Sequence, residues 1–133
     1  MLFDRFVGIP YLDKGRSLAG LDCYGLVRLV FRELRGIELP SYVADYATGA
    51  DRTAIAHLIK GEIDTWDEVG PGDEVAFDGI LIREAGFPRH IGLVVTPGLM
   101  LHVERGETSR VERYRAGTFS HRIAGFYRYR AQA

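Results

Sequence analysis

The chain has 133 residues, 47% of them hydrophobic and 26% charged, which is the composition of one folded domain and excludes a disordered chain. A net charge of −1 argues against a general nucleic-acid-binding protein, and a single cysteine excludes an internal disulfide and a thiolate cluster for zinc. We expect residues 1–133 to form a single domain.

The apolar runs of the chain are short. The longest ones, such as residues 91–95, fall far below the length that spans a bilayer, so membrane insertion is not expected. Residues 1–5 lack the basic-then-apolar pattern of a secretory signal. The sequence therefore predicts a protein made in a reducing cytoplasm without a signal peptide, although it could be carried elsewhere later.

The first helix is expected at residues 23–35. Asp22 precedes it in the position of an N-cap, and Gly36 follows it as a C-terminal stop. Arginines occupy one face of this segment at helical spacing, while the opposite face is apolar. That pattern predicts a helix with one buried face, formed by Cys23, Leu26, Val27, Val30 and Leu34.

Cys23 begins this helix. A helix N-terminus presents unpaired N–H groups and partial positive charge, which favour a thiolate over a thiol. The cysteine follows the capping Asp22 and is flanked by Gly20 and Gly25, so it lies at the tip of the buried stripe. We interpret Cys23 as a nucleophile.

The rest of the chain predicts one more helix and then strands. The helix is expected at 51–60, and residues 79–89 have a mixed pattern with a loop at 86–88. Helices first and antiparallel strands later indicate an α+β fold, with N-terminal helices packed on an antiparallel sheet. The expected strands are 74–77, the hairpin 90–95 and 99–104, then 109–114 and 123–129.

A thiol nucleophile needs a base, and the base needs a group that orients it. Among the histidines, His57 is expected to be structural, inside the second helix, and His121 is expected on the surface. His90 and His102 are better candidates because they lie on the two strands of the expected hairpin.

The turn of this hairpin decides whether His90 and His102 meet. A three-residue turn at 96–98, or a compensating bulge, would make them diagonal neighbours on one face, with Gly92 giving room between them. A regular two-residue turn would put them on opposite faces. We predict an odd-numbered turn or a bulge.

Arginines outnumber acids near the C-terminus. From residue 103 onward there are seven arginines and three glutamates. This excess predicts either a basic flank for an anionic substrate or partner, or simply a set of solvated strand positions.

Several motifs, taken in order, resemble the NlpC/P60 family of papain-like cysteine peptidases, especially its phage and prophage tail members. Gly-Ile-Pro-Tyr at residues 8–11 looks like the family's Gly-x-Pro-Tyr segment. Residues 20–27 are similar to the nucleophile motif Asp-Cys-Ser-Gly-Leu-Val, and residues 71–77 to the Gly-Asp strand. His-Ile-Gly at 90–92, followed by His102, resembles the catalytic histidine and the third polar residue.

The last strand of the family is similar to residues 125–129, so the resemblance covers most of the chain. It implies a papain-like NlpC/P60 fold. It also implies that Cys23 is the nucleophile, that His90 is the base that later protonates the leaving amine, and that His102 orients His90.

Three further residues match or depart from the family pattern. Tyr11 matches the tyrosine near the oxyanion site, with a packed aromatic as the alternative. Asp22 is expected to cap the helix rather than to act as a catalytic acid. Tyr24 replaces the usual serine after the cysteine, which is expected to narrow or reshape the cleft.

The family acts on peptidoglycan stem peptides, commonly at the bond between D-glutamate and the adjacent diamino acid. The resemblance implies a hydrolase of that class, which works through an acyl-enzyme as part of a phage or prophage tail. Its expected partners are the stem peptide and tail-tip proteins, and it would act at the cell wall. Phosphate loops, nucleotide motifs and metal-ligand spacings are absent from the sequence, so no cofactor is expected.

Other functions stay open at this point. One is a structural tail-assembly protein with a vestigial site. Another is an acyltransferase or deamidase that uses the same Cys-His-His triad on a different amide. A redox-sensing thiol is the least favoured, because the sequence contains no resolving cysteine.

Overall fold

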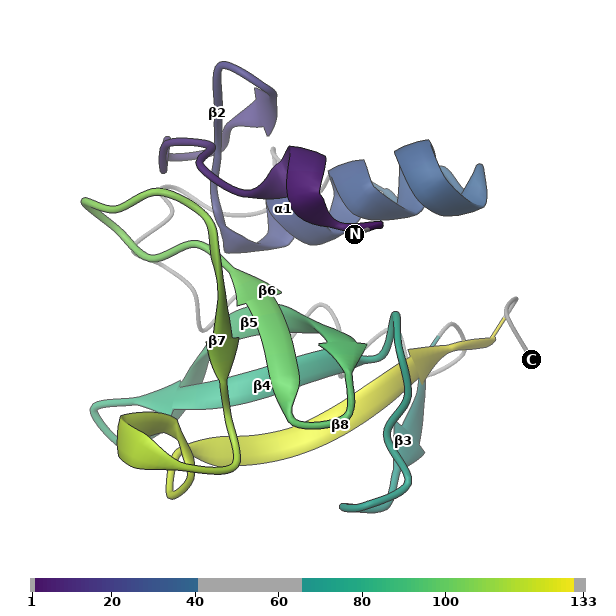
Figure 1. The fold of residues 1–133 in the computed structure, drawn as a ribbon, viewed down its shortest axis with the longest axis vertical. Coiled ribbons are helices and arrows are strands. Elements are labelled where there is room, and N and C mark those ends of the chain that lie inside the picture. Colours follow the sequence, from purple (N-terminus) through teal and green to yellow (C-terminus); the bar gives the residue numbers. More distant parts are fainter. Residues whose placement is uncertain (1, 41–65, 131–133) are drawn as a thin grey trace.

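The computed structural model describes residues 2–40 and 66–130, and these form an α+β architecture (Figure 1). Helix α1 (Cys23–Val30) packs on an antiparallel sheet of six strands, in the order β3-β8-β4-β5-β6-β7. The predicted fold class is confirmed, whereas the helix expected at 51–60 lies outside the described residues. Among the described helices, none combines the length and apolar character needed to cross a membrane.

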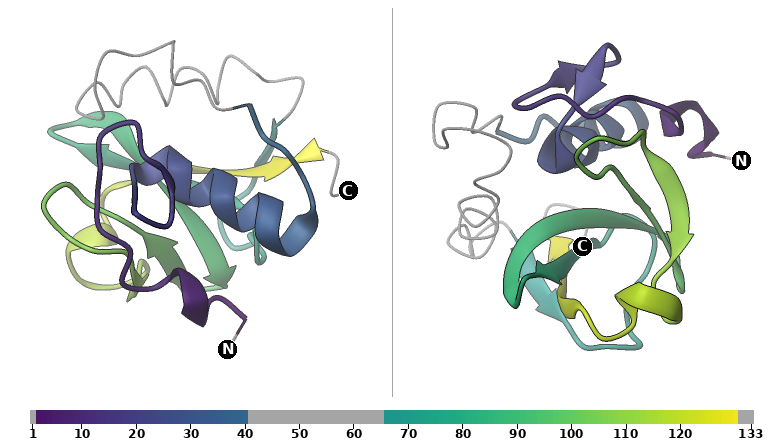
Figure 2. Two further views of the ribbon diagram at one scale, coloured as in Figure 1. Left: turned by 90° about the horizontal axis from the view of Figure 1, so that it is seen from above. Right: turned by 90° about the vertical axis from the view of Figure 1, so that its left-hand side faces the viewer.

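The sheet is strongly curved (Figure 2). Its strands are β3 (Trp66–Val69), β4 (Gly79–Glu84), β5 (Phe87–Thr96), β6 (Leu99–His102), β7 (Arg110–Arg113) and β8 (Ile123–Tyr129). The shorter elements are η1 (Asp4–Phe6), β1 (Arg16–Ser17), β2 (Gly20–Leu21), the π-helical turn η2 (Phe31–Arg35) and the 3₁₀ turn η4 (Gly117–Phe119).

Helix α1 begins where its sequence signal predicts, but it ends at Val30, and the rest of the expected 23–35 helix is the π-helical turn η2. The Asp22 side chain accepts a hydrogen bond from the Gly25 N–H at 2.7 Å, which is an N-cap. Gly36 ends η2 with a left-handed φ of 65°. The helix is buried beyond the predicted stripe, since Tyr24 and Leu29 are also covered. The small β1–β2 hairpin lies on the side of α1 away from the sheet (Figure 1).

Both faces of the sheet are buried. Alternating strand residues divide between two cores, as the period of two in a strand requires. One core lies between α1 and the sheet and includes Leu81 and Leu93. The other occupies the opposite face and includes Ile80, Val94 and Met100.

The strand expected at 74–77 is wrong. The Asp78 carboxylate accepts a hydrogen bond from the Val75 N–H at 2.8 Å, and the Asp78 N–H donates to the Val75 carbonyl at 3.1 Å. Phe77 adopts a left-handed φ of 74°. These local contacts close a turn, so the strand begins at Gly79 instead.

The loop expected at 86–88 is also wrong, because Phe87 already belongs to β5. Ala85 and Gly86 have positive φ angles of 51° and 83°, which suit a tight two-residue hairpin turn between β4 and β5. The register shift beside Arg83 then accommodates Pro88 in the strand.

The later strands follow the prediction closely. β8 coincides with the expected 123–129, β7 lies within 109–114, and β6 ends at His102, before the expected 104. The C-terminal arginines do not form an open basic flank, because at least five of the seven make ion pairs with acidic residues of the described ranges. Those five are Arg105, Arg110, Arg115, Arg128 and Arg130.

Candidate active site

The β5–β6 hairpin contains the predicted bulge. The pairing register shifts between Val94 and Thr96, so Val95 is an extra residue in β5. The turn itself contains only residues 97–98. The bulge adds the residue that the short turn lacks. The strand residues therefore face the same sides of the hairpin as they would after a three-residue turn.

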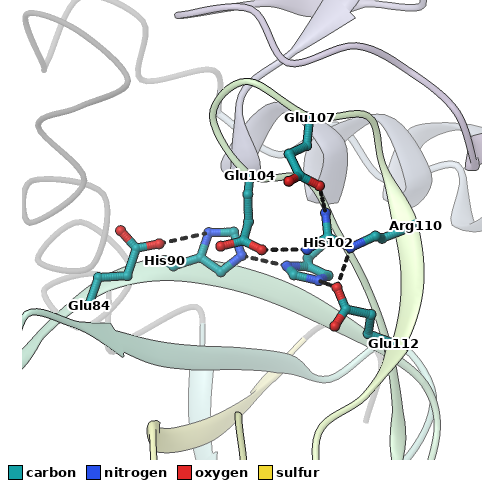
Figure 3. Close-up of polar contacts among 7 residues, drawn as sticks. All are labelled: Glu84, His90, His102, Glu104, Glu107, Arg110 and Glu112. Atoms are coloured by element: carbon teal, nitrogen blue, oxygen red, sulfur yellow. Dashed lines mark hydrogen bonds and ion pairs between the residues drawn. The ribbon is translucent and has the colours of Figure 1, made fainter. Parts of the chain in front are cut away.

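This parity brings His90 and His102 together, as predicted. The His90 Nε2 lies 2.8 Å from the His102 Nδ1, and the two residues are 1% and 0% exposed. Gly92 provides the space: a Cβ at this position would lie 3.3 Å from the Cβ of His102. The histidine pair is therefore a buried hydrogen-bonded unit (Figure 3).

The second ring nitrogen of His102 faces Glu112 on β7. The His102 Nε2 lies 3.0 Å from the Glu112 Oε1, and the His102 ring packs edge-on against Phe119 at 5.2 Å between centroids. Burial lowers the pKa of His102 and outweighs the opposing effect of the Glu112 hydrogen bond. His102 is thus held neutral at neutral pH.

Glu112 remains ionised beside it. Burial alone would raise the pKa of Glu112, but hydrogen bonds from His102 and Arg110 lower it below its ordinary value. The Arg110 guanidinium pairs with Glu112 and Glu104, and it reaches the Glu107 carboxylate at 3.0 Å (Figure 3).

Sequence reasoning missed Glu112 and Arg110. They are two residues apart on β7, so they share a face, and Arg110 is the strand partner of His102. The strand alternation of residues 110–113 predicts that Arg110 and Glu112 share a face. It does not predict that this face meets His102, because that requires knowing that β7 pairs with β6.

Glu84 is another acidic neighbour that the sequence did not indicate. It ends β4, and its Oε1 lies 4.0 Å from the Nδ1 of His90. A carboxylate therefore approaches each end of the histidine pair (Figure 3).

Cys23 lies at the N-terminus of α1, where the prediction put it. It is 1% exposed and belongs to the core between helix and sheet. Helix α1 packs against β5, the strand that carries His90. Asp22 is fully buried and also accepts a hydrogen bond from the Arg16 guanidinium at 2.8 Å. Sequence reasoning did not single out Arg16.

Tyr24 has a structural contact that its sequence position did not reveal. Its side chain is 1% exposed, and its hydroxyl donates a hydrogen bond to the Pro40 carbonyl at 2.7 Å. Arg28 donates to the neighbouring Leu39 carbonyl at 2.9 Å. Tyr24 thus fastens the chain after η2 to the first turn of α1.

Tyr11 lies where the N-terminal segment meets the β6–β7 loop. Its N–H donates to the Glu107 carbonyl at 2.9 Å, and its backbone bridges to Leu21 beside the start of α1. The Arg105 guanidinium lies 5.6 Å from the centre of its ring.

One group within the described ranges has the composition of a metal site. Ligand atoms of His102, Glu104 and Glu112 all lie within 4.8 Å of one another. Arg110, however, pairs with both carboxylates, so its guanidinium already supplies the positive charge there. A metal ion at this position would have to displace the guanidinium from both carboxylates.

The candidate site of this α+β protein thus consists of a buried thiol at the start of the helix and a buried histidine pair on the antiparallel sheet. The sequence model of the NlpC/P60 family matches residues 8–128. The chain belongs to the NlpC/P60 family.

Relatives of known description match over much of the chain. The gamma-DL-glutamyl hydrolase of Bacillus subtilis (strain 168) is 26% identical over 127 residues, which are 95% of this chain and 27% of that protein. The tail tip assembly protein K of Escherichia phage N15 is 28% identical over 130 residues, which are 92% of this chain and 50% of that protein. The chain therefore spans half or less of the length of these relatives.

Solved structures share the fold. An NlpC/P60 family protein from Bacillus cereus ATCC 10987 superimposes with a TM-score of 0.69 at 20% identity, over 95% of this chain and 37% of that one. The NlpC/p60 domain of the peptidoglycan hydrolase SagA gives a TM-score of 0.62 at 19% identity, over 95% of this chain and 91% of that domain.

Proposed function

We propose that the chain is a thiol-dependent hydrolase of peptidoglycan stem-peptide amide bonds, with Cys23 as nucleophile, His90 as base and His102 as the residue that orients His90. The observation that carries the proposal is the buried 2.8 Å hydrogen bond between the two histidines. His90 lies on β5, the strand against which the helix that begins with Cys23 packs. The chain also belongs to the NlpC/P60 family.

The chemistry follows from the ring nitrogens. His102 engages the Nε2 of His90, so we assign the Nδ1 of His90 to the thiol proton. The thiolate attacks the amide carbon, and His90 returns the proton to the leaving amine. Water, deprotonated by His90, then hydrolyses the thioester and releases Cys23. The Cys23 N–H and the Tyr11 hydroxyl are the proposed donors to the oxyanion.

The descriptions of two relatives support a glutamyl amide bond as the substrate and a phage tail as the setting. One is described as a gamma-DL-glutamyl hydrolase, and another as a tail tip assembly protein. We therefore propose cleavage between D-glutamate and the adjacent diamino acid. We also propose a single catalytic domain that acts at the cell wall as part of a phage or prophage tail, with tail-tip proteins as partners.

Iodoacetamide alkylation of Cys23 as a function of pH tests the activated thiol first. An ordinary cysteine has a pKa near 8.5, and pairing with a histidine lowers it by several units. We expect the alkylation midpoint to lie below about pH 7 in the wild type and near 8.5 in His90→Ala. The midpoint is the readout rather than the rate, because burial of the thiol slows alkylation at every pH alike.

His121→Ala is the matched control, because His121 is exposed and remote from this pair along the chain. Its midpoint should equal that of the wild type. An ordinary thiol midpoint in the wild type would sink the proposal and favour a structural tail protein with a vestigial site. With an activated thiol, purified muropeptides then separate a hydrolase from an acyltransferase, which would transfer the acyl group to an added amine in preference to water.

A further inference from the structure

The Nε2 of His102, which faces Glu112, determines where the protons lie in the histidine pair. Its partner, the Glu112 Oε1, is 3.0 Å away. An ionised carboxylate accepts hydrogen bonds and cannot donate them. The proton of this contact must therefore sit on the Nε2 of His102.

The remaining protons follow by elimination. A neutral His102 with a proton on Nε2 has its lone pair on Nδ1. That nitrogen can only accept, so the Nε2 of His90, 2.8 Å away, must donate. A neutral His90 then has its lone pair on Nδ1, and the Glu84 carboxylate at 4.0 Å is too far away to accept a hydrogen bond from that nitrogen. This is the protonation state that a base for the thiol requires.

Arg110 keeps Glu112 in its acceptor state. The guanidinium pairs through Nε with the same oxygen of Glu112 that faces His102, and through Nη2 with Glu104. The one guanidinium thus pairs with three carboxylates, those of Glu104, Glu107 and Glu112. The contacts that run from His90 through His102 and Glu112 to Arg110 lead outward from the buried pair to β7 (Figure 3).

We propose that Glu112, held by Arg110, is a positioning residue that fixes His102 as its Nε2–H tautomer and thereby makes the Nδ1 of His90 the basic nitrogen. This inference rests on the proposed function and adds a fourth residue to its triad. When His90 takes the thiol proton, the Glu112 carboxylate also stabilises the resulting positive charge through His102.

Nitrogen NMR of ¹⁵N-histidine-labelled protein reads the tautomer directly. In the wild type, the Nε2 of His102 should give the shift of a protonated ring nitrogen and its Nδ1 that of an unprotonated one. In Glu112→Gln, the amide can donate as well as accept, so a second His102 tautomer should appear. A wild-type His102 protonated on Nδ1 would overturn the inference, whether or not any variant folds.

The ultraviolet absorbance of the thiolate supplies the functional readout, because Cys23 is the only cysteine. We expect the thiolate midpoint of Glu112→Gln to rise by about one pH unit, which is a tenfold loss of thiolate at pH values below the midpoint. Glu107→Gln is the matched control. It removes an equal charge from Arg110, but its exposed side chain pairs with Arg110, whereas the hydrogen bond to His102 comes from Glu112, so its midpoint should stay at the wild-type value.

An open pocket permits a rescue experiment. It has a volume of about 520 Å³ and is lined by Glu112, Arg113, Phe119 and neighbouring residues. In Glu112→Ala, formate should enter this space, bind Arg110 and return the thiolate midpoint toward the wild-type value. Chloride at equal ionic strength should not.

The outcomes separate the two proposals. An ordinary thiol in the wild type removes the proposed function. An activated wild-type thiol with an unchanged tautomer and midpoint in Glu112→Gln leaves that function standing and overturns the role of Glu112. A shifted midpoint in Glu112→Ala that formate does not restore also counts against it, since loss of packing rather than of the carboxylate would then explain the shift.

Discussion

At the start of α1, the Asp22 side chain serves two neighbours with one oxygen. It caps the helix through the Gly25 N–H and pairs with the Arg16 guanidinium at 2.8 Å. Asp22 is fully buried and Arg16 is largely so, so the carboxylate is removed from water and held by its partners. The residue next to Cys23 is thus anchored from two directions.

Substitutions at Asp22 should separate these two roles. Asp22→Asn keeps an oxygen for the Gly25 N–H and loses the charge that pairs with Arg16. Asp22→Ala loses both, and the cap alone contributes about 1 kcal/mol to the free energy of unfolding. We expect urea unfolding to rank the proteins wild type, Asn, Ala in decreasing stability. Equal losses in both variants would show that the ion pair, and not the cap, dominates.

At the scale of elements, the β5–β6 hairpin positions both histidines by its backbone. The bulge at Val95 sets the parity, and Gly92 lets the two strands approach. A methyl group at Gly92 would lie 3.2 Å from an Ile80 methyl and 3.3 Å from the Cβ of His102. Such crowding leaves the fold intact but must displace a side chain by a few tenths of an ångström.

Gly92→Ala should therefore disturb the histidine pair more than the fold. We expect a loss of about 1–2 kcal/mol in the free energy of unfolding, together with a higher alkylation midpoint for Cys23. Gly79→Ala is the control on the adjacent strand, because a methyl group there would meet its neighbours at 3.5 Å or more. A wild-type midpoint in Gly92→Ala would show that this spacing is not needed.

For the molecule as a whole, Glu74 ties separate segments together. Its carboxylate accepts hydrogen bonds from the Gly72 N–H, the Tyr114 hydroxyl and the Arg115 guanidinium, at 2.7, 2.7 and 2.9 Å. Tyr114 in turn accepts from the Gly98 N–H in the β5–β6 turn. Burial would raise the pKa of Glu74, but these bonds lower it from 4.5 to about 2.

This low pKa predicts acid sensitivity. A carboxyl group with a lowered pKa in the folded state stabilises the protein fully above 4.5, and this stability is lost as the pH falls toward about 2. By pH 3 the loss from Glu74 should be about 2 kcal/mol. The free energy of unfolding should therefore fall less between pH 6 and pH 3 in Glu74→Gln than in the wild type. Equal slopes would contradict the assignment.

His102 and Glu112 shift stability in the same direction. Both have lowered pKa values in the folded state, so the folded chain binds fewer protons than the unfolded chain as the pH falls below about 6.5. The comparison of Glu74→Gln with the wild type subtracts these contributions, because both proteins retain them.

The sequence by itself determined the local parts of the site. Asp22, Cys23 and Gly36 define the start and end of a helix through contacts with near neighbours along the chain. Strand alternation allowed His90 and His102 to share a face if the turn was odd-numbered or a bulge was present, and the structure supplies the bulge at Val95. The order of a helix followed by antiparallel strands indicated the α+β class, because each of these elements is recognised from residues close together in the sequence.

Only the tertiary structure decided which distant groups meet these residues. Hydrophobic periodicity shows that a strand has a buried face but does not specify its partner strand. The order of the six strands brings Glu112 and Arg110 onto His102. The contacts of Arg16 with Asp22 and of Tyr24 with Pro40 likewise depend on how the chain folds back. Side-chain hydrogen bonds between such segments form only after packing has fixed their distance, so no pattern along the sequence predicts them.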